Sequence, residues 1–283
     1  MITGAEMLTD NEIAELKFLA KEIKIQTLKS IASIGIGHIG GSLSIAEALA
    51  VLYGKVMNYD INIPDNPERD YFVLSKGHAG PALYSALALK GFFPMEILAT
   101  LNQPDTMLPS HPDRRKTPGV DMTTGSLGQG ASSACGIALG NKMNKFNNYT
   151  YVMFGDGELQ EGQIWEALMF ASQWELSNLI AFVDHNNLQI DGTVDEICSL
   201  GDLTEKFRSF NWNAENVNGH DVNEIYLAVM RAKEHNNDKP SVIIMETVKG
   251  NGISVFENKA SSHNSAVTSE ILARGLKELE ETL

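Results

Sequence analysis

Two short polar motifs, each placed directly after an apolar run, carry residue types that could bind a metal ion and an anion. The first is Gly155-Asp156-Gly157, which follows the run Tyr151–Phe154. The second is Asn186-Asn187, which lies shortly after the run Leu179–Val183. A carboxylate and an amide brought together supply the oxygen ligands that Mg²⁺ or Ca²⁺ takes in proteins. The flanking glycines would let the backbone approach an anion closely.

The elements around these motifs alternate between strands and helices. Strands are predicted at 71–74, 151–154, 179–183 and 241–246, and helices at 10–33, 44–57, 81–90, 131–144, 161–174 and 268–283. Asp10 is the predicted cap of the first helix. The alternation predicts an α/β doubly wound fold, with a mainly parallel sheet and helices on both faces. Ligands bind at the carboxyl ends of strands in such sheets, so both motifs are expected to face one site.

Composition narrows the class of protein. The 283 residues are 43% hydrophobic and 20% charged, which favours a folded core over disorder. The net charge of −14 argues against nucleic-acid binding, which needs a basic surface. The two cysteines, Cys135 and Cys198, form no C-x-x-C pair, so two structural thiols in a reduced, cytoplasmic protein are expected. No signal-peptide pattern or membrane-length apolar run is seen, and no membrane partner is expected.

The short sequence segments around the two motifs resemble those of the transketolase family. The pair GDG and NN is the thiamine diphosphate motif, and the intervening LQEG and WEAL resemble transketolase in particular. Met122–Gly130, reading MTTGSLGQG, and the words GHIGGS and SKGHAG add to the resemblance. It spans most of the chain, and the motifs occur in the order found in the family. The expected fold is therefore a thiamine diphosphate-binding fold, with 1–283 as one diphosphate-side domain that ends in a helix.

The resemblance implies thiamine diphosphate and Mg²⁺ as cofactors, with Ca²⁺ or Mn²⁺ as alternative metals. The metal would be bound by Asp156, by the side chain of Asn186 and by the backbone carbonyl of Leu188. Few protein ligands completed by diphosphate oxygens suit Mg²⁺. The residues implied to contact the cofactor are His78, Gly125, Ser126, Leu127, Gly157, Asn186 and His263.

Four of the seven histidines fall at positions that match the family: His38, His78, His111 and His263. A lone histidine is more often structural than catalytic, but four in one family pattern favour a catalytic role. The resemblance implies that they bind substrate hydroxyls and assist proton transfer. His78 and His263 would lie nearest the cofactor, and His38 and His111 nearest the sugar.

Two glutamates, Glu161 and Glu166, match carboxylates that link two active sites across a transketolase dimer. The structural alternative is that they complement the start of a helix. Glu161 is expected to be a catalytic residue with a supporting role in proton coupling. His185, His220 and His235 are not expected to take part in the site.

The chain is less than half the length of a full transketolase, whose middle domain supplies the glutamate that activates the cofactor. No second α/β block follows residue 265. The resemblance therefore implies the N-terminal subunit of a split transketolase, in two copies, with the pyrimidine-side domain on two copies of a separate C-terminal subunit. Such a transferase moves a two-carbon ketol unit from a ketose donor to an aldose acceptor, with sugar phosphates as substrates, only when its partner is present.

Alternative functions stay open. The chain departs from the family at Ile39, at Asn102 and around His263, which favours a modified sugar or a secondary-metabolism acyl substrate. The alpha subunit of a 2-oxoacid dehydrogenase and deoxyxylulose-phosphate synthase share the cofactor, but GHIGGS and SKGHAG favour transketolase. A non-catalytic module with the same fold is the last alternative, against which stand the intact metal motif and the four histidines.

Overall fold

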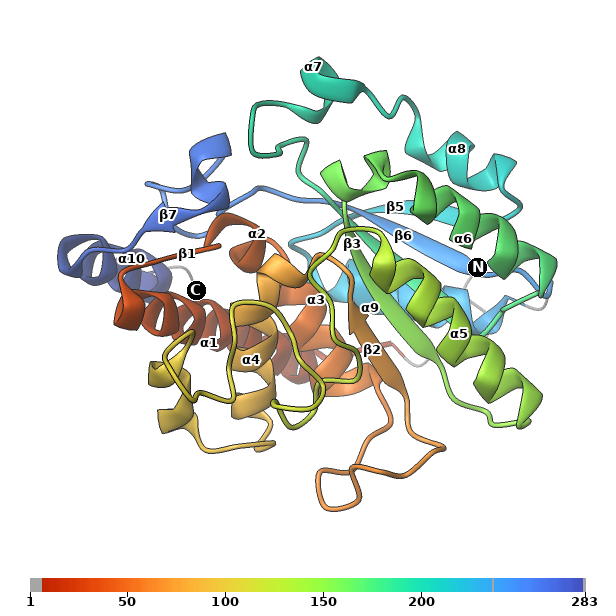
Figure 1. Ribbon diagram of the computed structural model, residues 1–283, viewed down its shortest axis with the longest axis horizontal. Helices are drawn as coiled ribbons and strands as arrows, with labels where there is room; N and C mark the ends of the chain where they lie inside the picture. Colours follow the sequence, from red (N-terminus) through yellow and green to blue (C-terminus); the bar gives the residue numbers. More distant parts are fainter. Residues whose placement is uncertain (1–6, 236, 282–283) are drawn as a thin grey trace.

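The computed structural model describes residues 7–235 and 237–281 and is built around a five-stranded sheet (Figure 1). The strands are β2 (Tyr71–Leu74), β3 (Thr150–Gly155), β4 (Leu179–His185), β5 (Asn213–Asn218) and β6 (Ser241–Glu246). They pair in parallel in the order β2-β3-β4-β6-β5. All the carboxyl ends therefore lie at one edge of the sheet. The predicted α/β fold with a parallel sheet is confirmed.

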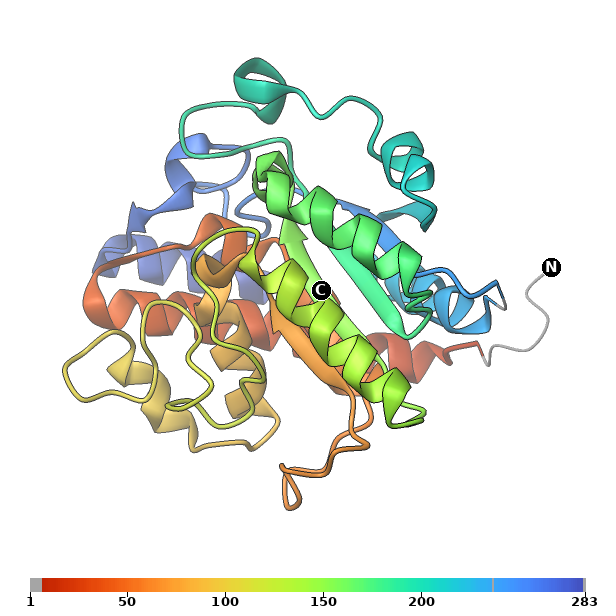
Figure 2. The ribbon, with the colours of Figure 1, turned by 45° about the vertical axis from the view of Figure 1, so that its right-hand side comes forward.

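Helices cover both faces of the sheet (Figure 2). One face is covered by α1 (Asp10–Ile34), α3 (Ala46–Val51), α4 (Gly80–Leu89) and α9 (Val222–Glu234). The other face is covered by α5 (Gln129–Met143), α6 (Gly162–Gln173) and α8 (Leu203–Ser209). Strands β2, β3, β4 and β6 are buried on both sides of the sheet. In β3, for example, Tyr151 packs into one core and Val152 into the other. This burial explains why the predicted strands read as unbroken apolar runs.

The remaining elements are short or peripheral. They are α2 (Gly40–Leu43), α7 (Val194–Cys198), α10 (Ser269–Glu281), the π-helical turn Leu52–Val56, and four 3₁₀ turns at Gly77–Ala79, Met95–Thr100, Gly157–Gln160 and Ala260–His263. The two-residue strands β1 (Ile36–Gly37) and β7 (Ser265–Ala266) pair antiparallel outside the main sheet. Helix α10 packs on α1. No helix in the described ranges is long and apolar enough to cross a membrane.

The structure differs from the sequence-based expectations at the start of α1, at one cysteine and over the predicted helix 44–57, which is divided into α3 and the π-helical turn Leu52–Val56. Thr9, not Asp10, caps α1, because its hydroxyl accepts the Glu12 amide in a capping box. Cys135 is buried, but Cys198 is exposed, so the prediction of two structural thiols is wrong for the second. The end of the predicted last helix, residues 282–283, lies outside the described residues.

Candidate active site

The carboxyl ends of β2, β3, β4 and β6 lead into a cavity of about 360 Å³. The predicted site residues that line it are His38, His78, His111, Gly125, Leu127, Asp156, Gly157, Glu161, Asn186, Leu188 and His263. Ser126 is exposed and is not among the described lining residues, although both of its neighbours are. The fold thus brings together segments that are far apart in the sequence.

Asp156 joins the ends of β3 and β4. Its side chain is 2% exposed, and one carboxylate oxygen accepts the backbone amides of Asn186 (2.8 Å) and Asn187 (2.5 Å). The other oxygen accepts the amide of Gly157 at 2.7 Å. Burial, and next the charge of Asp184, raise the pKa of Asp156 to about 6. These three amide hydrogen bonds hold the carboxylate in one orientation.

The three predicted metal ligands form a donor set that fits Mg²⁺. The amide nitrogen of Asn186 donates to Asp184 at 2.9 Å, and its side-chain oxygen accepts the Leu188 amide at 3.1 Å, which leaves a second lone pair of that oxygen for a metal ion. Asp156 adds a carboxylate and Leu188 a carbonyl oxygen, all of them hard oxygen donors. No cluster of three or more His, Cys, Asp or Glu that could hold a metal occurs among the described residues. With one carboxylate in the set, water molecules or the oxygens of a bound anion such as a diphosphate would supply the remaining ligands.

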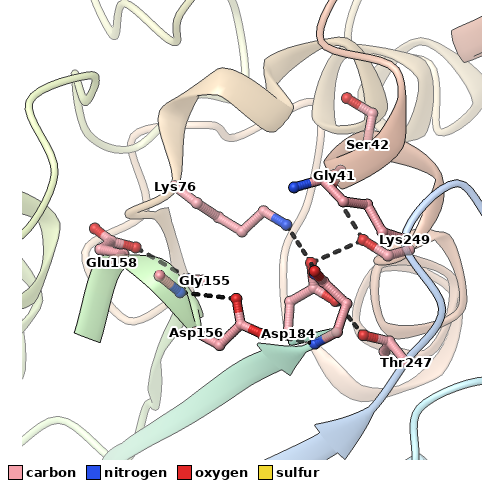
Figure 3. Close-up of polar contacts among 12 residues, drawn as sticks. Gly41, Ser42, Lys76, Gly155, Asp156, Glu158, Asp184, Thr247 and Lys249 are labelled. Atoms are coloured by element: carbon pink, nitrogen blue, oxygen red, sulfur yellow. Dashed lines mark hydrogen bonds and ion pairs between the residues drawn. The ribbon is translucent and has the colours of Figure 1, made fainter. Parts of the chain in front are cut away.

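A buried charged cluster centred on Asp184 supports these ligands (Figure 3). The Asp184 side chain is fully buried and accepts hydrogen bonds from Lys76 (2.5 Å), Ser44 (2.8 Å) and Thr247 (2.5 Å). Burial alone would raise its pKa, but the adjacent Lys76 ammonium overrides that effect and keeps the pKa of Asp184 low. The cluster ties the end of β4 to the segments that follow β2 and β6.

Lys249 brings a second buried ammonium into the cavity. It is 3% exposed, and its Nζ donates to the Leu188 carbonyl at 2.9 Å and lies 3.4 Å from Nδ1 of His263. Burial, and next the charge of Lys76, lower the pKa of Lys249 to about 8. Two cations therefore stand in a cavity that is expected to receive a diphosphate.

The four predicted histidines lie together on one side of the cavity. The ring of His38 is 5.5 Å from that of His78, 5.8 Å from that of His111 and 5.3 Å from that of His263, between centroids. The rings of His78 and His263 are 4.8 Å apart. His78 and His263 come from the 3₁₀ turns Gly77–Ala79 and Ala260–His263. The family resemblance implied that these four histidines lie near one another, and their ring distances agree with that expectation.

The pKa of each of the four imidazoles is lowered, which favours the neutral form of the ring. Burial lowers the pKa of His38, His78 and His111, and the shift is largest for His78, beside Lys76. Burial, and next the charge of Lys249, lower the pKa of His263 to about 3. A neutral imidazole carries one donor and one acceptor nitrogen, so these rings can bind hydroxyl groups and relay protons.

The two carboxylates after the GDG turn have different surroundings. Glu161 is exposed where it borders the cavity, at the start of α6. Glu158 is 3% exposed and accepts hydrogen bonds from Ser75 (2.5 Å), Gly128 (2.9 Å) and Gly155 (3.1 Å). Glu158 thus fixes the glycine-rich loop before α5 against the end of β3.

Several buried site residues were not predicted, although each lies beside a predicted motif. Lys76 is in SKGHAG, Glu158 follows GDG, and Asp184 comes two residues before Asn186. The available signal was a charged residue placed directly after a buried strand. Of the other histidines, His185 pairs with Glu246, His220 accepts the Val248 amide and His235 borders a different pocket. None of these three is among the described residues that line the cavity.

The fold and this site define a thiamine diphosphate-binding enzyme. The family model described as "Transketolase, thiamine diphosphate binding domain" matches residues 16–279. The chain therefore belongs to the transketolase family.

The chain is similar to separate transketolase subunits of about its own length and to part of much longer transketolases. The 6-deoxy-6-sulfo-D-fructose transketolase subunit SqwG of Clostridium sp. (strain MSTE9) is 53% identical over 94% of this chain and 96% of that protein. An apulose-4-phosphate transketolase subunit of Phocaeicola vulgatus is 36% identical over 96% of each chain. Human transketolase is 36% identical over 95% of this chain but only 42% of its own length. The solved transketolase from Leishmania mexicana superposes with a TM-score of 0.89 at 30% identity, over 97% of this chain and 42% of that one.

These matches confirm the predicted class of enzyme and cofactor. The chain is a transketolase N-terminal subunit of the split type, a transferase that uses thiamine diphosphate with a divalent metal ion. The roles of the individual residues stay predictions.

Proposed function

We propose that this chain, together with a separate C-terminal pyrimidine-binding subunit, transfers a ketol unit from a 6-deoxy-6-sulfoketose to an aldose phosphate. The supporting observation is that 96% of the length of a 6-deoxy-6-sulfo-D-fructose transketolase subunit matches this chain at 53% identity. The apulose-4-phosphate subunits and human transketolase are 36–38% identical. The proposal thus adopts the modified-sugar alternative for the donor. For the active enzyme we propose two copies of each subunit.

The departures from the family pattern contribute little to this choice of donor. Ile39 is fully buried, and Asn102 is exposed in a turn and is not among the described lining residues of the cavity. Of the segment around His263, only His263 itself is among the described residues that line the cavity. The identity to the relative therefore carries the proposal.

We assign each residue of the cavity a role that suits its chemistry. Metal binding is assigned to Asp156, Asn186 and Leu188, and cofactor contacts to His78, Gly125, Ser126, Leu127, Gly157, Asn186 and His263. Thiamine diphosphate, when bound, supplies the electron sink for breaking the donor's carbon–carbon bond. The neutral rings of His38 and His111 are assigned to the sugar hydroxyls, and those of His78 and His263 to proton transfer near the cofactor. Glu161, at the border of the cavity, is assigned to proton coupling across the subunit interface.

The test compares the chain alone with the chain co-purified with its partner subunit. Both are assayed with thiamine diphosphate, Mg²⁺ and ribose 5-phosphate as acceptor, using 6-deoxy-6-sulfo-D-fructose or xylulose 5-phosphate as donor. We expect turnover only with both chains, and a kcat/KM at least about tenfold higher for the sulfonated donor, the size of one lost or gained polar contact. Robust turnover by the chain alone would refute the need for a partner. Equal or better use of xylulose 5-phosphate would refute the donor.

A further inference from the structure

We propose that Lys24, Glu47 and His220 form a positioning network that holds the segment 247–252, and with it Lys249, in place against the cofactor site. None of the three is among the described residues that line the cavity. Lys249 points into the cavity from this segment, which follows β6. The significance of Lys249 rests on the proposed function, but the network is a feature of the chain itself.

The first half of the network is a buried ion pair between two helices. Lys24 on α1 donates to the Glu47 carboxylate on α3 at 2.6 Å, with side-chain exposures of 7% and 10%. The same ammonium donates to the side-chain oxygen of Asn251 at 2.5 Å. Lys24 therefore fixes the far end of the segment that carries Lys249.

The second half runs through His220, in the loop between β5 and α9. The Val248 amide donates to Nε2 of His220 at 2.8 Å, so Nε2 bears a lone pair and the proton of the neutral ring is on Nδ1. Nδ1 lies 3.3 Å from the second carboxylate oxygen of Glu47. Glu47 thus orients His220, and His220 fixes the residue before Lys249.

The segment itself is short and sharply turned, and the two side-chain attachments add to its backbone hydrogen bonds in fixing its path. Gly250 and Gly252 have φ values of +79° and +92°, which favour glycine. The Gly250 amide donates to the Gly40 carbonyl at 3.0 Å. Between the attachments at Val248 and Asn251, the Lys249 ammonium reaches the Leu188 carbonyl and His263.

A role in stability alone does not account for this network. Burying two charges carries a desolvation penalty, and an apolar pair of similar volume is often at least as stable. What a buried polar network adds is a single geometry for the groups that it binds. The network is therefore expected to control the position of Lys249 more than the free energy of unfolding.

The first test uses hydrogen exchange of the full chain in complex with its partner subunit, without substrate. His220→Leu removes the acceptor for Val248, whereas His220→Gln retains an acceptor and a donor. We expect amide exchange of residues 248–252 to quicken about tenfold in His220→Leu, the effect of one lost hydrogen bond, and to return toward wild type in His220→Gln. Equal exchange in wild type and both variants would overturn the proposal.

The second test separates position from stability. The double variant Lys24→Met/Glu47→Leu replaces the ion pair with apolar side chains. We expect its Tm to equal or exceed that of the wild type, while exchange of residues 248–252 quickens and kcat falls at least about tenfold with little change in donor KM. An unchanged kcat and unchanged exchange would overturn the proposal.

The matched control is Asp121→Asn, which weakens the buried Arg69–Asp121 ion pair beside the start of β2. It should lower the Tm without changing exchange in 248–252 or kcat. If the control reduces kcat as much as the network variants do, the network acts through general stability and the proposal fails. Because exchange is measured without substrate, a wrong donor assignment leaves this result unaffected.

Discussion

At Asp156, burial and hydrogen bonding act in opposite directions. Three backbone amides stabilise the carboxylate, yet burial and Asp184 raise its pKa to about 6. A metal ion must then compete with a proton whenever the pH falls below that value. The metal site is thus coupled to pH through a single carboxyl group.

Mg²⁺ affinity in the presence of thiamine diphosphate is expected to fall about tenfold per pH unit below pH 6 and to level off above it. Calorimetric titrations of the subunit pair between pH 5 and 8 measure this. Asp156→Asn should weaken binding by at least about tenfold and remove the dependence. Glu270→Gln changes an exposed carboxylate on α10, outside the described lining of the cavity; it is the control and should leave both unchanged. A flat affinity from pH 5 to 7 in the wild type would contradict the prediction.

His263 makes a prediction about acid stability. The pKa of its imidazole is lowered from the ordinary 6.5 to about 3, so only the unfolded state gains its proton as the pH falls between those values. Its contribution to the free energy of unfolding is therefore complete above pH 6.5 and is lost progressively toward pH 3. His263→Gln should reduce the loss between pH 7.5 and 4.5 by about 1 kcal/mol, after discounting for solvent screening.

Urea unfolding at the two pH values tests this expectation. His235→Gln, which changes an exposed histidine outside the cavity, is the matched control and should leave the acid loss as it is in the wild type. An equal acid loss in wild type and His263→Gln would mean that the neutral form of His263 is not imposed by the fold.

At the scale of elements, the sequence predicts the strands that are buried and misses the one that is not. β2 and β6 were predicted to their exact bounds, because each is a short apolar run. β5, at one edge of the sheet, reads NAENVN, and only Val217 in it is buried. A polar edge strand has no apolar pattern to detect, since its place depends on the pairing with β6.

The same limit applies to the site. The predicted metal ligands and the four histidines were proposed from motifs, each a short local stretch of the sequence. The contact between Lys76 and Asp184 joins the ends of two strands separated by β3, so it depends on the strand order. The attachment of the stretch around Lys249 to Lys24 and His220 could not be derived from spacing, because it joins segments that are far apart in the sequence.

Close packing of α5 against β2 makes a prediction at this scale. A Cβ at Gly130 would lie 2.4 Å from the Ser75 hydroxyl oxygen and 2.6 Å from the Ser75 Cα. Gly130→Ala should therefore lower the free energy of unfolding by about 1–3 kcal/mol, as overpacking does. Gly136→Ala on the same helix has no described atom within 4 Å of the added methyl and should be neutral or stabilising by up to about 1 kcal/mol. Equal effects in urea unfolding would contradict this interpretation.

At the scale of the whole molecule, the cavity draws on residues from His38 to His263. Segments from four strand ends, the 38–44 loop and the last 3₁₀ turn must all be in place before it is complete. Packing on both faces of the sheet holds these ends in register. Cofactor binding should therefore report on the folding of the whole subunit rather than of one motif.

The strand order β4-β6-β5 has a consequence for synthesis on the ribosome. β5 leaves the exit tunnel before β6, yet β6 is the strand on which it pairs and which separates it from β4. β5 therefore cannot join the sheet until residues 241–246 have emerged and paired with β4. Lys249 and His263 follow later still, so a chain stalled before them has most of a sheet but cannot yet retain its cofactor.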